Sequence, residues 1–161
     1  MKHRLKLVFA LIFAVSVIGN FIIPGISSAS EPVTVGVLHW KAFAYADMMK
    51  NSYEMALEDI NKAGGINGRP LKLVYADDQG KRDAGEKAVA ELADKGVAML
   101  IGGYASSNTI YTARRADRMN MPFLICTAAD DRITQRKWKN VFRLNPPAGS
   151  YTIRIGRFFS E

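Results

Sequence analysis

Apolar and polar positions along the chain form blocks of two kinds. Short apolar runs rich in β-branched residues lie at 33–38, 71–76, 97–101 and 122–125, with a weaker one at 141–144. Such runs are typical of strands buried in a parallel sheet. The longer segments between them repeat their apolar residues with a helical period. In 47–63, one face carries Met49, Tyr53, Ala56, Leu57 and Ile60.

Three further helices are expected. They cover about 83–95 with Asp83 as the N-cap, 107–119, and 150 to the last residue. Strands that alternate with helices of this length predict an α/β fold, with a parallel sheet, helices on both faces and right-handed crossovers. Ligands of such sheets bind beyond the carboxyl ends of the strands. The loops that begin at His39, Asp77, Gly102 and Cys126 are therefore the candidates for a site.

The first residues have the pattern of an export signal. Lys2, Arg4 and Lys6 form a basic start, an apolar core follows, and small residues lie near Ala29. We expect cleavage after Ala29 and a periplasmic protein, secreted through this cleaved signal peptide. An uncleaved membrane anchor is the alternative, because the apolar run approaches spanning length.

Charge and cysteine usage exclude some classes of function. The net charge is +7, and three of these charges leave with the signal. The rest are spread over the chain without a nucleic-acid motif, so we expect no nucleic-acid partner. The single cysteine, Cys126, has no internal partner for a disulfide and is interpreted as a small buried hydrophobe.

The loop at 102–109 has the features of an anion site. Gly102 and Gly103 let the backbone approach a ligand closely, with Tyr104 beside them. The hydroxyls of Ser106 and Ser107, with the unpaired N–H groups of a helix start, are suited to a carboxylate. The alternative is that either serine is an ordinary N-cap.

No catalytic or metal-binding constellation is visible. Asp77 and Asp78 are adjacent acids in a turn without a His at ligand spacing, and His39 has no evident catalytic partner. Phosphate-loop and dinucleotide fingerprints are absent from the sequence. We expect no enzyme activity, no metal and no cofactor.

Three segments together resemble a known family. They are the helix-to-strand corner at 57–71 with its Gly64-Gly65 turn, the Gly-Gly-Tyr-Ala-Ser-Ser loop, and Phe-Arg-Leu-Asn-Pro-Pro at 142–147. The chain from Pro32 to Pro147 resembles the Leu/Ile/Val-binding family of periplasmic solute-binding proteins, which serve ABC importers. The resemblance implies the first lobe of a two-lobed, type I periplasmic binding fold.

The resemblance also implies roles for individual residues. Ser106 matches the family's carboxylate-binding serine. Backbone N–H groups around Thr127, Ala128 and Ala129 match a second wall, although Ala129 lies where the family has threonine; Thr127 is an alternative source of that hydroxyl. Tyr45 aligns with a ligand-facing aromatic. Trp40 and Phe43 either extend that wall or pack beneath the loop.

We therefore expect a signal peptide at 1–29, a ligand-binding lobe at 30–147 and the truncated start of a crossover and second lobe at 148–161, in a chain that is either a fragment or a truncated gene product. The resemblance implies capture of an amino acid or related small carboxylate or amide, for delivery to an ABC permease and ATPase complex in the inner membrane. A periplasmic sensing module of the same fold is the alternative. Residue patterns leave the solute open among leucine-like, polar, aromatic and amide compounds.

Overall fold

The computed structural model describes residues 30–160, except for the side chain of Arg154, so the expected signal peptide lies outside the described residues. Five parallel strands form one sheet in the order β2-β1-β3-β4-β5. Their bounds are β1 Val33–His39, β2 Leu71–Asp77, β3 Met99–Gly102, β4 Phe123–Ile125 and β5 Val141–Arg143. The predicted α/β fold with a parallel sheet is confirmed.

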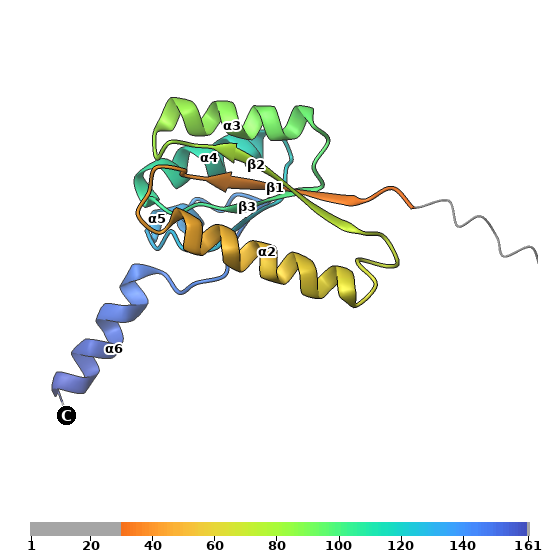
Figure 1. Cartoon of the computed structure of the whole chain (residues 1–161). Coiled ribbons are helices and arrows are strands. Elements are labelled where there is room, and N and C mark those ends of the chain that lie inside the picture. The colour runs from red at the N-terminus through yellow and green to blue at the C-terminus, as the bar shows by residue number, and fades with distance from the viewer. Residues whose placement is uncertain (1–29, 161) are drawn as a thin grey trace, which may run out of the picture. The chain divides into compact units, whose positions relative to one another are not determined.

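The helices connect these strands and lie on both faces of the sheet (Figure 1). They are α2 Ala46–Lys62, α3 Arg82–Asp94, α4 Ser106–Arg118, α5 Arg132–Gln135 and α6 Ala148–Ser160. Each predicted helix is present within a residue or two. Within residues 30–160, none of the helices has the length and apolar character that crossing a membrane requires.

One local expectation was wrong, and one short helix was not expected. Asp83 does not cap its helix: α3 begins at Arg82, its N-cap is Lys81, and Asp83 lies in the first turn, where its charge suits the helix dipole. The short helix α5 was not expected. Its four residues carry a single buried apolar side chain, Ile133, which is too little for a periodic signal.

The core lies between the sheet and the α3–α4 pair. Leu92 of α3, Leu100 of β3, and Phe123 and Ile125 of β4 are completely buried there. Gly36 of β1 has no room for a side chain on this face, because an added Cβ would lie 2.8 Å from Leu100. Close packing of this kind holds the carboxyl ends of β1, β3 and β4 in fixed positions.

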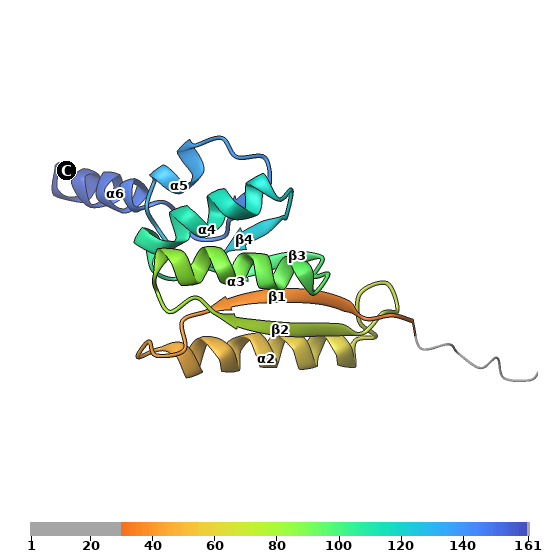
Figure 2. The same cartoon turned by 90° about the horizontal axis from the view of Figure 1, so that it is seen from above.

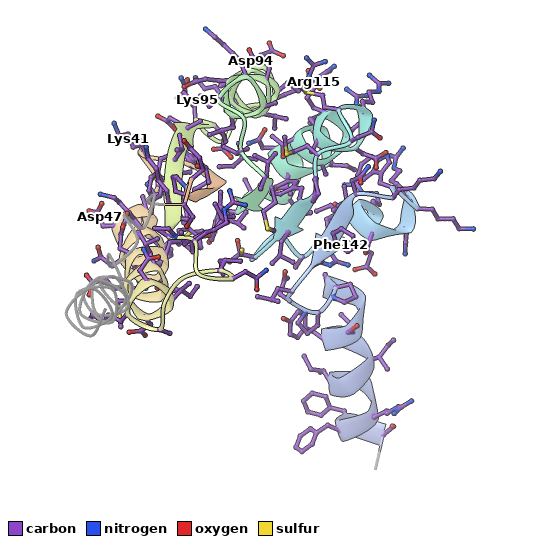
Figure 3. The ribbon with its side chains drawn as sticks, turned by 90° about the vertical axis from the view of Figure 1, so that its right-hand side faces the viewer. Lys41, Asp47, Asp94, Lys95, Arg115 and Phe142 are labelled. Atoms are coloured by element: carbon purple, nitrogen blue, oxygen red, sulfur yellow. The ribbon has the colours of Figure 1, made fainter. Side chains whose placement is uncertain are left out.

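Of the helices in residues 30–160, α2 is the one that covers the opposite face, where it lies along β2 (Figure 2). Four apolar side chains in register cross this face from β1 to β5: Val37, Ile101, Leu124 and Phe142. Val37 is completely buried, the next two are half-buried, and Phe142 is 54% exposed (Figure 3). Burial therefore falls away steadily with distance from α2.

Helix α6 projects from the lobe without packing against the sheet. Its apolar side chains are exposed, with Phe158 and Phe159 at 77% and 80% (Figure 3). Only its first turn is anchored: the N–H of Ala148 donates to the carbonyl of Ala129 at 2.7 Å, and the N–H of Gly149 donates to Asp131 at 3.0 Å.

Candidate functional site

Two loops at the carboxyl edge of the sheet form the centre of the site. One follows β3 and leads into α4, and the other follows β4 and leads into α5. They are joined by backbone hydrogen bonds, from Cys126 N–H to the Gly102 carbonyl at 2.8 Å and from Ala128 N–H to the Gly103 carbonyl at 2.9 Å. The predicted residues Ser106, Thr127 and Ala129 are thus brought to one edge.

The two glycines of the first loop are required by its geometry. Gly102 has φ 120°, and a Cβ there would lie 2.4 Å from the carbonyl oxygen of Leu38. Gly103 has φ 78°, and a Cβ would lie 2.9 Å from the methyl of Thr109. Both positions combine a left-handed backbone with close approach, which only glycine tolerates well. The turn delivers the chain directly to the start of α4.

Neither serine is the N-cap of α4. The cap is Ala105, whose side chain makes no capping hydrogen bond. The Ser106 hydroxyl instead accepts a hydrogen bond from the N–H of Asp130 at 3.3 Å, which links α4 to the second loop. Within residues 30–160, the N–H groups of Ser106 and Ser107 have no hydrogen-bond partner. The helix start therefore keeps donors that an anion can use.

The second loop contributes further donors. Among the described residues, the N–H groups of Thr127 and Ala129 have no partner either. The Thr127 hydroxyl donates to the carbonyl of Gly103 at 2.9 Å, so its proton is engaged within the protein. Four unpaired backbone N–H groups and the Ser106 hydroxyl thus occur in two loops that are hydrogen-bonded to each other. Their chemistry suits a carboxylate.

An open hollow of about 520 Å³ borders these loops. Ser106 and Ala129 line it on the lobe side, with Asp130 and Asp131, and Ala148, Gly149 and Thr152 line it at the start of α6. The carboxylates of Asp130 and Asp131 both accept hydrogen bonds from other protein groups. Hydrogen bonds from Arg132 lower the pKa of Asp130, and Asp131 accepts from Gly149 N–H. Ser107 faces a different hollow, between α4 and α5.

Four aromatic rings follow β1 and β3 at the same edge. Phe43 stacks on Trp40 with ring centroids 5.0 Å apart and lies 4.1 Å from Tyr104 and 5.4 Å from Tyr45. Trp40 and Phe43 are half-buried, and Trp40 also covers Gly80, so both pack beneath the loop. Tyr45 is 54% exposed and Tyr104 36%. The two tyrosines are the part of this wall that a ligand can reach.

Asp77 and Asp78 order the turn after β2. Asp77 accepts hydrogen bonds from the N–H groups of Lys41 and Gln79. Asp78 is 4% exposed and accepts from Gly80 N–H and from the side-chain amide of Asn108, at 3.0 Å each. Burial raises the pKa of Asp78. Within residues 30–160, no three His, Cys, Asp or Glu side chains gather closely enough to hold a metal ion.

Two supporting residues were not identified from the sequence. The Asn145 amide donates to the carbonyl of Thr127 at 3.1 Å, and the Arg143 guanidinium donates to the carbonyl of Asp130 at 2.8 Å. Both hold the second loop from the end of β5. They belong to the segment at 142–147 that carried part of the resemblance, but no pattern in that segment indicates which backbone atoms its side chains contact.

Comparisons with known proteins agree with this architecture. Residues 32–161 match the family model described as periplasmic binding protein. The Leu/Ile/Val-binding protein homolog 3 of Brucella melitensis is 30% identical over 144 residues, which cover 87% of this chain and 37% of that protein. Homolog 7 of the same organism is 27% identical over 157 residues, covering 96% of this chain and 37% of its own length.

Solved structures of ABC transporter substrate-binding proteins have a similar fold. An ABC transporter substrate-binding protein from Desulfitobacterium hafniense, in complex with Leu, superimposes with a TM-score of 0.74 and 27% identity, covering 80% of this chain and 38% of that one. The branched-chain amino acid transporter substrate binding protein LivJ of Streptococcus pneumoniae, in complex with isoleucine, has the same fold, with a TM-score of 0.68, 19% identity, and 73% and 34% coverage.

The chain spans little more than a third of the length of these curated relatives. The matching segment nevertheless includes the whole sheet, both loops of the candidate site and α6. On this match, the chain belongs to the periplasmic binding protein family.

Proposed function

We propose that this chain forms the first lobe of an extracytoplasmic solute-binding protein of an ABC importer, and that it captures an amino acid or a related small carboxylate or amide. One observation carries the proposal: four unpaired backbone N–H groups and the Ser106 hydroxyl occur in two loops that are hydrogen-bonded to each other. The relatives named as Leu/Ile/Val-binding proteins support the class of solute.

The lobe supplies one side of such a site. The carboxylate would accept hydrogen bonds from the N–H groups of Ser106 and Ser107 at the positive end of α4 and from those of Thr127 and Ala129. The Ser106 hydroxyl would turn from accepting to donating towards the ligand, since a hydroxyl does either. Tyr45 and Tyr104 would contact the rest of the solute.

Residues 30–147 are proposed as this lobe, and 148–161 as the start of a connection to a second one. The open apolar face at Phe142 and the exposed apolar side chains of α6 support the proposal, because both are surfaces that further polypeptide would cover. In the complete protein, closure of two lobes around the solute would select the form that a membrane permease and its ATPase recognise. An address outside the cytoplasm follows from the family and from the expected signal at 1–29.

An NMR titration of the purified, isotope-labelled protein tests the solute site even when binding is weak. Addition of leucine should shift the amide signals of Ser106, Ser107, Thr127 and Ala129. Leucinamide, which has the same side chain but no carboxylate, should shift them far less. Equal shifts with both compounds would contradict the assignment of these donors to a carboxylate, and no shifts with either compound up to about 20 mM would contradict the whole proposal.

Two serine variants test whether the Ser106 hydroxyl contacts the solute. Ser106→Ala should weaken leucine binding by about 1.5–3 kcal/mol, the range for a hydrogen bond to a charged group. Ser52→Ala is the matched control, since the Ser52 hydroxyl bonds the Met48 carbonyl on the exposed side of α2. An unchanged affinity in Ser106→Ala would remove this serine from the site.

A further inference from the structure

A second hollow lies beside α4, between that helix and the segment that carries α5. It encloses about 340 Å³. Three arginines line it, Arg114 from α4 with Arg132 and Arg136 from the α5 segment. Its other lining residues are Ser107, Ile110, Tyr111 and Trp138. Below, these seven residues are called the side pocket. None of them belongs to the loop after β4 or to the aromatic rings of the solute site.

The side pocket has unneutralised positive charge. Arg132 is paired with Asp130 at 2.6 Å, and Arg114 is paired with Glu86 at 3.0 Å. Glu86 is shared, because Arg82 also lies 3.8 Å from it. Among residues 30–160, Arg136 has no carboxylate within ion-pair distance. No acidic side chain of the described residues lines the hollow itself, and Arg136 is the lining arginine whose guanidinium an anion could bind without displacing a carboxylate.

The apolar residues of the pocket present flat surfaces. Tyr111 lies close to two guanidinium groups, with the central carbon of Arg82 4.6 Å and that of Arg114 5.5 Å from its ring centroid. Trp138 is half-buried and packs against the core, as does Ile110. Aromatic rings held in this way offer contact area at little entropic cost, and guanidinium groups bind planar anions through paired N–H groups.

We propose that the side pocket is a second ligand site, which binds a small organic anion with a flat apolar body. The carboxylate or phosphate group would lie between Arg136 and Arg114, within reach of the Ser107 hydroxyl, and the apolar body would rest on Tyr111, Ile110 and Trp138. The volume suits a molecule with a single ring and one charged group. The site is separate from the proposed solute site except at Ser107, whose hydroxyl belongs to the side pocket and whose backbone N–H belongs to the solute site.

The two tryptophans of the chain allow a direct test, because each marks a different site. In a ¹H–¹⁵N spectrum, the indole N–H signal of Trp138 should shift on addition of benzoate or phenyl phosphate, and the signal is assigned by its loss in Trp138→Phe. The indole signal of Trp40 reports the aromatic wall of the solute site. Comparison of the Trp138 shifts with benzoate and with phenyl phosphate shows whether the pocket prefers a carboxylate or a phosphate ligand.

Two further compounds test separately whether the pocket needs the charged group and whether it needs the ring. Benzyl alcohol, which has the ring but no charge, and inorganic phosphate, which has charge but no ring, should each bind at least tenfold more weakly than the better organic anion. Equal binding of benzyl alcohol, or no saturable shift of Trp138 up to about 20 mM anion, would overturn the proposal.

Variants separate this site from the solute site. Arg136→Ala should weaken anion binding at least tenfold and Arg136→Glu should abolish it; both change an exposed side chain without a partner that is needed for folding. Arg115→Ala removes the same charge from an exposed position on α4 outside the pocket and should change nothing (Figure 3). Ser106→Ala should leave the Trp138 response intact. Unchanged affinity in Arg136→Glu would refute the side pocket, while leucine shifts at Thr127 and Ala129 would still stand or fail independently.

Discussion

The two faces of the sheet differ in how completely they are covered. On one face, α3 and α4 seal a core in which Leu100 and Phe123 have no exposed surface. On the other face, α2 covers only the strands at one side, and Phe142 at the far strand is more than half exposed (Figure 2). The sealed face positions the solute site, because α4 begins there and the loop glycines pack against it.

The open face shows that the spacing of apolar residues does not reveal whether a face of the sheet is covered. Its apolar residues have the same strand-like spacing as those of the sealed face, so sequence pattern alone cannot distinguish a covered surface from an uncovered one. The distinction emerges only from the packing. An apolar row that is half exposed contributes little to the stability of this lobe and is available to whatever else packs there.

The largest expected difference between the faces is in the free energy of unfolding. Phe123→Ala on the sealed face should lower it by about 3–5 kcal/mol, because it leaves a cavity in a close-packed core. Phe142→Ala on the open face should cost less than about 1 kcal/mol, as for a largely exposed side chain. Urea denaturation measures both. Equal losses would mean that the two faces are equally covered in solution.

A smaller effect is expected where the sealed face meets the solute site. Gly103→Ala should cost about 1–3 kcal/mol, because the backbone is left-handed and the new methyl would press on Thr109 and the ring of Phe123. Gly68 is a matched control: its φ of 76° is nearly the same as the 78° of Gly103, but an added Cβ there has no atom within 4 Å. Gly68→Ala therefore reports the backbone strain without the clash.

If both alanine variants lose the same stability, the close approach at Gly103 contributes nothing and the sealed face tolerates a methyl group at its edge. A larger loss at Gly103 should be accompanied by weaker leucine shifts at Ser106 in the NMR titration. That link is expected because Gly103 leads directly into α4.

On the open face, hydrogen bonds connect α2 to β2 at two places, one between Asn61 and the backbone of Leu71 and the other between Glu54 and Tyr75. The Tyr75 hydroxyl donates to the Glu54 carboxylate at 2.8 Å, and burial together with this bond raises the pKa of Tyr75. Tyr75→Phe should lower the unfolding free energy by about 1 kcal/mol. A double-mutant cycle with Glu54→Gln measures the coupling, and a coupling near zero would show that the Tyr75–Glu54 hydrogen bond does not help to hold α2 on the sheet.

The smallest expected effect is a change of slope with pH. Burial raises the pKa of Asp78 on the sealed face, so the folded protein binds this proton more tightly than the unfolded chain does. The stabilising contribution is complete below the unfolded pKa of about 3.9 and is lost as pH rises through the folded pKa. The unfolding free energy should therefore fall as pH rises above the unfolded pKa, relative to Asp78→Asn.

The neighbouring Asp77 serves as the control for that comparison. Its carboxylate also accepts backbone hydrogen bonds in the turn, but the residue is exposed. Asp77→Asn should reduce this pH dependence without abolishing it, because burial is the larger cause of the raised pKa of Asp78 and the charge of Asp77 is a smaller one. A stability difference between wild type and Asp78→Asn that is flat with pH, or that has the opposite sign, would contradict the assignment to burial.

The strands and long helices were predictable because each shows its own period of apolar residues, and the family was recognisable from the corner at 57–71 and the loop at 102–109. The details of the site were not. Ser106 and Ser107 are adjacent and chemically identical, yet one lines the hollow at the edge of the sheet and the other lines the side pocket, a difference set by the helical rotation between neighbours. The contacts of Asn145 and Arg143 likewise depend on tertiary packing.

The direct hydrogen bonds between the loops after β3 and β4 have a consequence for how binding preference changes. In the proposed solute site, the donors for an acid group would be positioned when the lobe folds, so the entropic cost of ordering them would not recur with each solute. Exchange of Tyr45 or Tyr104 for another side chain would then alter which compounds are favoured while leaving the grip on their common acid group intact. A change of solute preference would then require substitutions in the aromatic wall alone, while the loops that bind the acid group stay the same.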